Sequence, residues 1–421
     1  MREQILHFIW EHQYYDIGKG FTQDNLPIQV IKTGKPHINA GPDFEQAKLL
    51  IGKVEWNGDV EIHIKSSDWD AHKHQLDKAY NKVVLHVVWV NDKLVKREDG
   101  TFMPTLVLQP IVQADVLEKA ETLLGSLAPV PCATQILAVP NIIITNEIQR
   151  TLIKRLARKA AIITTELIEA KGNWNEVTYR VFMRQMGMKV NSNAFYDLAL
   201  IIPYALIRKY AHSVFQIESL LFGASGLLTN SNDDYAIELG KEYEFLTHKH
   251  KIKRQLNAEN WKFLRLRPAN FPTLRLAQAA AILASPEALF DIFIEQEALQ
   301  IKLQCNPSSY WKKHYKFGVK ANGKVPTLGK ASIDLIGINV VAPVLTAYSK
   351  SIQNDEYIQQ ALALLEQLKP EQNKIIRIWE GLSVKAANAG ESQGLIELYN
   401  ENCSNKTCLT CGIGFNLIKH K

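Results

Sequence analysis

The sequence predicts an α/β N-terminal domain with a mixed sheet over residues 1–125 and a larger, mostly α-helical region over residues 126–421. Short alternating or β-branched apolar runs dominate the first part, whereas long segments with three-to-four-residue apolar spacing dominate the second. The pattern changes near residues 115–135, where Pro129 and Pro131 also lie. A length of 421 residues favours two or three domains, and a hydrophobic fraction of 46% is ordinary for a globular protein.

The elements of the N-terminal domain are predicted from residue spacing. Residues 3–12 read as an amphipathic helix, because their apolar side chains fall on one side. Residues 83–90, VVLHVVWV, are a β-branched run suited to a buried strand. Asp99-Gly100 is typical of a tight hairpin turn. The other expected elements, in order, are strands at 26–32 and 44–51, a turn at Trp56 to Gly58, a strand through Glu61 and a short helix at 72–81.

After residue 115 the chain carries a series of amphipathic helical patterns without a fixed-period repeat or a low-complexity linker. No apolar run reaches the roughly 18 residues expected of a membrane span. Acidic and histidine residues in the first positions disfavour a signal peptide. Five cysteines, an odd and sparse set, disfavour a disulfide framework, so we expect a cytoplasmic location. The clearest helical segments are 114–127, 145–171, 193–211, 273–285 and 331–350.

A polar face on one predicted strand points to metal chemistry. Glu61, His63 and Lys65 alternate with apolar residues, so their side chains share one face. Asp43 stands just before the strand at 44–51, which can lie beside it. Two carboxylates on neighbouring strands can hold Mg²⁺ or Mn²⁺, and the metal activates water and stabilises charge on a phosphate. His63 or Lys65 would orient that water or stabilise the phosphate. The alternative is an exposed face with solvated charges.

Further potential ligands follow closely. His72, His74 and Asp77 can support the carboxylates through hydrogen bonds or hold zinc themselves, although a helix would put His72 off the face that His74 and Asp77 share. The alternative is a set of capping and surface side chains. His86 lies inside an apolar strand and is expected to be a buried, hydrogen-bonded histidine.

The C-terminal segment carries Cys403, Cys408 and Cys411 within nine positions. Thiolates at this spacing suit Zn²⁺ or an iron–sulfur cluster, and either would require a fourth ligand. Cys132, Cys305 or a histidine could supply it after folding. The alternative is three reduced thiols with structural or incidental roles.

Basic segments suggest nucleic acid as a partner, which the formal net charge of +6 permits. Arg150, Lys154 and Arg158 recur every fourth residue of a predicted helix, with Arg155 and Lys159 beside them. The runs 249–254 and 261–278 add further basic residues, the second interleaved with aromatic side chains that could stack on bases. The alternative is a solvated helix face paired with acidic residues elsewhere.

The order helix, three strands, helix, strand resembles the PD-(D/E)xK nuclease superfamily, whose core is a restriction-endonuclease-like mixed sheet. Pro42-Asp43 matches its first motif and Glu61 matches the acid of its second. His63 stands where the superfamily has lysine, and Lys65 on the same face is the candidate replacement. The resemblance implies a metal-dependent nuclease. The alternative is an inactive relative that serves as a nucleic-acid-binding or scaffolding module.

Over nearly its full length the chain is similar to the DUF2851 family of bacterial proteins of unknown function. The residues that carry this resemblance are NAGPDF, GDVEIHIKSSDW, HKHQLDKAYNKVVLHVVW, LRPANFPTLRLAQ and CSNKTCLTCGIG. The family implies no activity, so the nuclease hypothesis depends on the polar strand and on the order of the elements.

Overall fold

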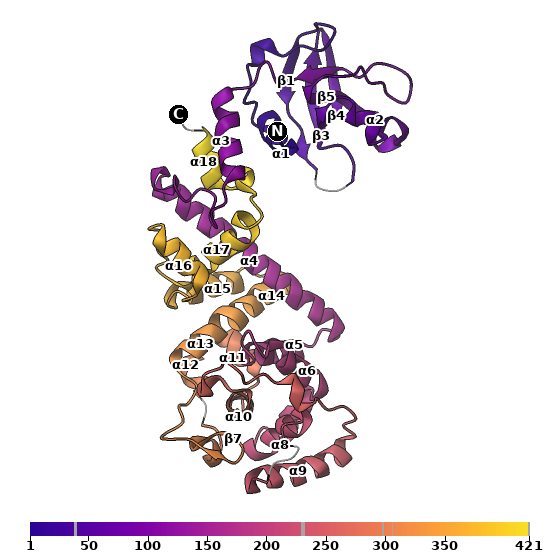
Figure 1. The fold of residues 1–421 in the computed structure, drawn as a ribbon. Helices are drawn as coiled ribbons and strands as arrows, with labels where there is room; N and C mark the ends of the chain where they lie inside the picture. Colours follow the sequence, from indigo (N-terminus) through magenta and orange to yellow (C-terminus); the bar gives the residue numbers. More distant parts are fainter. Residues whose placement is uncertain (38–39, 229–231, 297–298, 305, 420–421) are drawn as a thin grey trace. The chain divides into compact units, whose positions relative to one another are not determined.

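The computed structural model describes residues 1–37, 40–228, 232–296, 299–304 and 306–419 (Figure 1). The chain forms two compact units, one of Met1–Ile148 with Leu398–Lys421 and one of Gln149–Glu397. The predicted fold class is confirmed, because the first unit contains a mixed sheet and the remainder is mostly helical. The units differ from the predicted division at residues 125 and 126, since the C-terminal segment belongs to the unit that contains the sheet.

The sheet of the first unit has the strand order β1-β3-β4-β5-β6, with β2 paired to the first two residues of β3. Strands β3 and β4 are antiparallel to each other, and β4, β5 and β6 are parallel neighbours. The strand bounds are β1 Ile28–Lys32, β2 Lys35–Pro36, β3 Phe44–Ile51, β4 Val54–Lys65, β5 Val83–Val90 and β6 Thr105–Val107.

The hairpin between β3 and β4 turns earlier than the sequence predicted. Ile51 pairs with Val54, so the turn is made by Gly52 and Lys53, and the expected turn residues Trp56 to Gly58 lie inside β4. Gly52 has a φ of 63°, a conformation that glycine adopts at little cost. The turn predicted at Trp56 to Gly58 was wrong because Gly58 is needed for close packing of two strands and does not form a turn. A Cβ atom there would lie 2.4 Å from the Lys82 carbonyl oxygen, so this glycine permits close approach of the chain that enters β5.

The crossover from β4 to β5 covers the polar face of β4. It contains the short helix α2, Asp68–Ala71, and 3-10 turns at His74–Leu76 and Lys78–Lys82, in place of the single helix predicted over 72–81. The helix cannot continue because Lys73 has a φ of 64°. Both α2 and the second 3-10 turn pack against β4.

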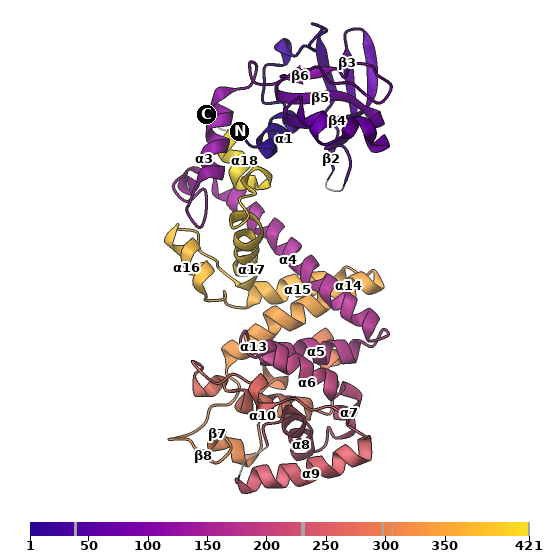
Figure 2. The same ribbon diagram turned by 45° about the vertical axis from the view of Figure 1, so that its right-hand side comes forward.

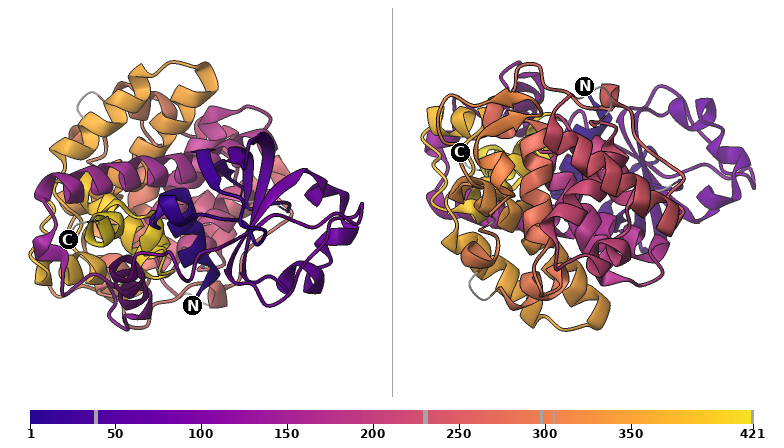
Figure 3. Two further views of the ribbon diagram at one scale, coloured as in Figure 1. Left: turned by 90° about the horizontal axis from the view of Figure 1, so that it is seen from above. Right: turned by 90° about the horizontal axis from the view of Figure 1, so that it is seen from below.

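The core of the first unit is completed by α1, Glu3–Glu11, which packs on β4 and β5 (Figure 3). Its five apolar side chains are buried as predicted, and each large one contributes roughly 1.5–3 kcal/mol of stability. The C-terminal helix α18, Gly412–Lys419, packs against α3, Ala114–Gly125, and its Phe415 meets Phe8 of α1 edge to face. These contacts explain why the C-terminal segment belongs to this unit.

The second unit is a helical assembly around one large apolar core, with a small hairpin of two strands (Figure 2). The first unit ends within α4, Asn141–Glu169. The remaining elements are α5 Trp174–Met186, α6 Ser192–Ile201, α7 Tyr204–Lys209, α8 Val214–Ser225, α9 Asp234–His250, α10 Pro272–Leu283, α11 Leu289–Glu295, α12 Leu299–Lys302, β7 His314–Lys316, β8 Val319–Lys320, α13 Lys330–Ile336, α14 Ala342–Ile352, α15 Glu356–Gln367, α16 Lys374–Gly381 and α17 Ala389–Glu397.

One helix in the described part of the chain passes a length and hydropathy test for a membrane span, contrary to the sequence expectation. It runs over Lys330–Ile352, joining α13 to α14 through a π-helical turn at Gly337–Val341. Within its most apolar stretch, 67% of the residues are buried inside the unit. This burial is that of a core helix, and such a helix is weak evidence for a membrane location.

A buried carboxylate in α8 makes the stability of the second unit depend on pH. Glu218 accepts hydrogen bonds from Tyr235, Ser308 and Trp311, but burial outweighs them and raises its pKa from 4.5 to about 7. The folded protein therefore binds this proton more tightly than the unfolded chain does. The resulting stability is present below pH 4.5 and is lost as the pH rises through about 7.

We therefore expect Glu218→Gln, which keeps an oxygen acceptor and removes the charge, to be more stable than the wild type at pH 8 by about 3 kcal/mol. Urea unfolding at pH 5 and pH 8 measures the difference. A variant that loses stability equally at both pH values would show that the carboxylate is needed for its hydrogen bonds alone.

Candidate metal centre

An aspartate and a glutamate are locked together where β3 begins beside β4. The Asp43 backbone N–H donates to Glu61 Oε2 at 3.1 Å, and the Ile62 N–H donates to Asp43 Oδ2 at 2.9 Å. This reciprocal pair exists because Phe44 is paired with Val60 across the two antiparallel strands. The structure thus brings together the two acids that the sequence singled out.

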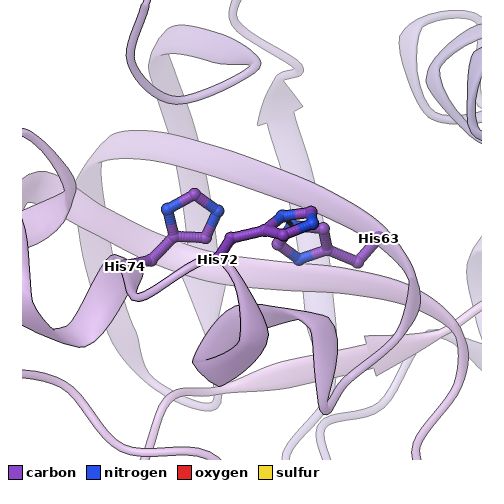
Figure 4. Close-up of side chains that lie close together, drawn as sticks. All are labelled: His63, His72 and His74. Carbon is purple, nitrogen blue, oxygen red and sulfur yellow. Dashed lines mark hydrogen bonds between the residues drawn. The ribbon is translucent and has the colours of Figure 1, made fainter.

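Two histidines lie against the other oxygen of Glu61, and a third histidine joins them. His63 from β4 and His74 from the crossover place their Nε2 atoms 3.5 Å and 3.3 Å from Glu61 Oε1. His72 completes the group, with its Nδ1 atom 3.1 Å from His63 Nε2. One nitrogen from each of the three rings lies within 4.8 Å of the others, and Figure 4 shows the rings gathered beside one another. Three nitrogen donors therefore lie together, and two of them also lie beside Glu61 Oε1.

His86 on β5 fixes the orientation of the central ring. Its Nε2 atom lies 2.8 Å from His63 Nδ1, because Glu61 and His86 are register partners in the parallel pair β4 and β5. The bond occupies the Nδ1 side of His63 and leaves Nε2 directed toward the other donors. His86 is fully buried and hydrogen-bonded, as the sequence predicted.

Burial controls the charge of the cluster. Burial, followed by the nearby charges of His74 and His72, lowers the pKa of His63 to about 4, and burial also places the pKa of His86 well below its usual range. Burial raises the pKa of Glu61. The His74 Nε2 atom is buried and lies 3.3 Å from Glu61 Oε1. A neutral imidazole with an unused lone pair is the form of histidine that binds metal ions.

Aromatic residues in the crossover between β4 and β5 explain why this cluster forms. Trp69 is buried in α2 and meets both His74 and His86 at ring distances of 5.4 Å and 5.5 Å. Tyr80 stacks on His74 with ring centres 3.8 Å apart. These aromatic contacts hold the crossover over β4, so His74 is 8% exposed while His72, at the end of α2, faces solvent.

Two predicted site residues are not part of the group. Lys65 follows on the same strand face but is exposed, and no contact joins its ammonium group to either acid among the described residues. Asp77 is exposed and caps the 3-10 turn by accepting the Ala79 N–H at 2.9 Å. It does not join His72 and His74, because the chain turns at Lys73 instead of forming one helix.

Sequence reasoning missed His7, which approaches the site from α1. Its Nε2 atom lies 3.4 Å from Asp43 Oδ2. Burial opposes protonation of His7, but the hydrogen bond and charge of Asp43 outweigh it and raise the pKa of His7. No local sequence pattern could have identified His7 as a site residue, since it lies 36 positions before Asp43. The helix that contains it was predicted from its apolar side chains alone.

The basic stripe predicted on α4 is partly engaged inside the second unit. Arg155 and Arg158 both form ion pairs with Glu397, at 2.9 Å and 2.7 Å. Lys159 donates to Asn339. These three basic residues are therefore paired within the unit, as in the alternative of a helix face paired with other residues. Residues 250–254 instead line a pocket of about 460 Å³ together with Lys209.

The cysteines of the C-terminal segment are buried and reduced, and so is Cys132. All four lie in the first unit. Cys305, another candidate for the fourth ligand, lies outside the described residues.

Comparison with known proteins gives one result. A model of the DUF2851 family, described as a protein of unknown function, matches residues 3–374. The match ends before the cysteine segment, although the resemblance had included its CSNKTCLTCGIG motif. No curated protein and no solved structure matches the chain. This chain belongs to the DUF2851 family.

Proposed function

We propose that this protein is a metal-dependent hydrolase that cleaves phosphodiester bonds of nucleic acid. The observation that carries the proposal is the cluster of His63, His72 and His74. His63 and His74 also lie beside Glu61 Oε1, and Glu61 is itself locked to Asp43. Burial of polar groups is costly unless they are hydrogen-bonded or bind an ion, and imidazole nitrogens beside a carboxylate match the ligands of catalytic metal sites.

The donor set favours a transition metal over the Mg²⁺ or Mn²⁺ expected from the two acids alone. Imidazole nitrogen suits zinc and iron, whereas Mg²⁺ prefers oxygen. His63, His72, His74 and Glu61 would hold the ion. A metal bound there supplies an activated water and neutralises charge on the phosphate.

The surrounding residues have separate tasks in this proposal. His86 holds the His63 ring with Nε2 toward the site, in the way that partners of metal-binding histidines orient their rings. Asp43 keeps Glu61 in position through its backbone N–H. His7, beside Asp43, holds a proton near the acids, and it supplies the positive charge that the superfamily takes from lysine.

The second unit provides the surface proposed for nucleic acid. Lys209, Lys251, Lys253 and Arg254 line one pocket with several apolar side chains. Basic groups at such a site bind phosphates, and the binding should weaken as salt increases. Lys249 packs over the Tyr210 and Phe245 rings, which places aromatic side chains beside the basic run.

We expect purified, metal-free protein to cut single- or double-stranded DNA or RNA when Zn²⁺, Mn²⁺ or Fe²⁺ is restored, and to be less active with Mg²⁺ at equal concentration. The measurement is cleavage of labelled oligonucleotides across this metal series under anaerobic conditions for Fe²⁺. Highest activity with Mg²⁺ would instead favour the two-acid site predicted from sequence.

One alternative has a specific observation in its favour. Histidine occupies the position of the superfamily lysine, and Lys65 makes no contact with the acids among the described residues. A protein that has lost its chemistry would act as a nucleic-acid-binding or scaffolding module. Salt-sensitive binding without cleavage in every metal would support the module, and the absence of both would contradict both functions.

A further inference from the structure

A lysine of the second unit lines a small pocket that the proposed hydrolase activity does not use. Lys159 in α4 shares a pocket of about 260 Å³ with side chains of α5 and of the π-helical turn Gly337–Val341. The walls are largely apolar, with contributions from Ile162, Ile163 and Val181. Among the described residues, no aspartate or glutamate lines this pocket. The contacts of the lysine amine therefore decide what the pocket can bind.

The amine of Lys159 is hydrogen-bonded to an amide oxygen and not to a carboxylate. Its Nζ atom donates to Asn339 Oδ1 at 2.8 Å, and it forms no ion pair within the described part of the chain. The carboxylate of Glu397 pairs instead with two arginines of the same helix, Arg155 at 2.9 Å and Arg158 at 2.7 Å. An ammonium ion at position 159 would therefore add a positive charge close to two guanidinium groups, without an ion pair of its own to stabilise it.

These surroundings favour the neutral form of the amine. Burial, followed by the charge of Arg155, lowers the pKa of Lys159 to about 7, although Glu371 and Glu397 oppose the change. An ordinary lysine, with a pKa of about 10.4, is neutral in roughly one molecule in 2,500 at pH 7. About half of the Lys159 side chains are neutral at the same pH. A neutral amine has a free lone pair and is a nucleophile, whereas an ammonium ion is not.

Asn339 reaches Lys159 from an irregular part of its helix. It lies in the π-helical turn, against which α5 packs. Pro343, which also lines the pocket, has no N–H for the carbonyl group of Asn339 four residues earlier, so the regular α-helical hydrogen bond cannot form there. Turns of this kind are frequent at functional sites. The irregular turn and the reactive form of the amine thus occur at the same pocket.

We propose that Lys159 forms a Schiff base with a small, largely apolar aldehyde or ketone that enters this pocket. The amine nitrogen attacks the carbonyl carbon, and the carbonyl oxygen then leaves as water with the two amine hydrogens, so a C=N bond replaces the C=O bond. The compound is small, because the pocket lies below the range of about 300–1,000 Å³ for sites that hold drug-sized ligands.

The second cation that lines the pocket does not compete for this role. Arg184 pairs with Glu166 at 2.9 Å and stacks over the Tyr196 ring, and a guanidinium group does not lose its proton in proteins. Lys159 is therefore the nucleophile of this pocket. The reaction involves neither the histidine cluster nor nucleic acid, so it goes beyond the proposed hydrolase function and does not depend on it.

The test is to trap the imine in the full-length wild-type protein. The protein is incubated at pH 7 with limiting butanal, and sodium cyanoborohydride reduces each imine to a stable secondary amine that peptide mass spectrometry locates. We expect Lys159 to be labelled at least about tenfold faster than Lys154, an exposed lysine of the same helix, since more of its amine is neutral. This ratio should fall between pH 7 and pH 9, where ordinary lysines gain neutral amine. Equal labelling at pH 7, or no label on Lys159, would overturn the proposal.

A variant at the edge of the pocket tests whether the aldehyde enters there. Ile162 lines the pocket and is 48% exposed, so Ile162→Trp narrows the pocket without changing the core. It should slow the labelling of Lys159 by about tenfold or more and leave that of Lys154 unchanged. Ile168→Trp, at an exposed position of α4 outside the pocket, is the control and should leave both rates unchanged. Circular dichroism first establishes that both variants fold. Undiminished labelling of Lys159 in Ile162→Trp, or an equal loss in the control, would overturn the pocket as the binding site.

Discussion

Glu61→Gln is expected to reduce metal-dependent cleavage more than about 100-fold, since changes in groups that merely orient metal ligands already cost 10–100-fold. Glu61 Oε1 is the oxygen that both His63 and His74 approach, at 3.5 Å and 3.3 Å. Glutamine retains the shape and can still accept the Asp43 N–H, but a neutral amide is a much weaker metal ligand than a carboxylate. The measurement is the cleavage rate together with the metal bound per chain.

The matched control is Glu55→Gln on the same strand. Glu55 is exposed on β4 and pairs with Lys48 at 2.9 Å, so its replacement should leave both cleavage and metal content within about twofold of wild type. The Glu61 variant should also fold normally, because it removes a buried charge whose pKa burial already raises. Full activity in Glu61→Gln would contradict the proposed site, and equal loss in both variants would implicate the fold of β4 instead.

Gly58→Ala is expected to destabilise the sheet by about 3 kcal/mol, the upper part of the range for overpacked sites. The new Cβ would lie 2.4 Å from both the Lys82 carbonyl oxygen and Val84 Cγ1. Relief requires the start of β5 to move away from β4, since a backbone carbonyl cannot rotate aside as a flexible side chain can. The same movement would shift His86 and loosen its hold on His63, so metal affinity should also fall.

Thermal unfolding and hydrogen–deuterium exchange over residues 54–90 measure this effect. Gly125→Ala is the control, because Gly125 lies at the exposed end of α3 and a Cβ there meets nothing within 4 Å. It should be neutral or slightly stabilising, by up to about 1 kcal/mol. Faster exchange confined to β4 and β5 in the Gly58 variant would support the close-approach argument, and unchanged exchange would refute it.

Local pattern was sufficient for much of the first unit. Apolar spacing and turn chemistry predicted the helix at 3–12, the strand at 83–90 and the turn at Asp99-Gly100. The structure has α1 and β5 at the first two places, and at the third a turn closed by the hydrogen bond from the Arg97 N–H to the Thr101 carbonyl oxygen. Such features depend on a few neighbouring residues, which the sequence presents directly. The alternation of Glu61 and His63 with apolar residues likewise required only the period of a strand.

What the sequence by itself determined was the identity of the polar groups: two acids, a run of histidines and a set of cysteines. Only the tertiary structure decided which of them meet. Lys65 and Asp77 looked equivalent to their neighbours, yet one is exposed and the other caps a turn. His7 joined the acids through the packing of α1 on β4 and β5, a contact between residues far apart in the chain. The reason is physical, since spacing fixes the face on which a side chain lies, whereas its partners depend on which surfaces are buried against each other.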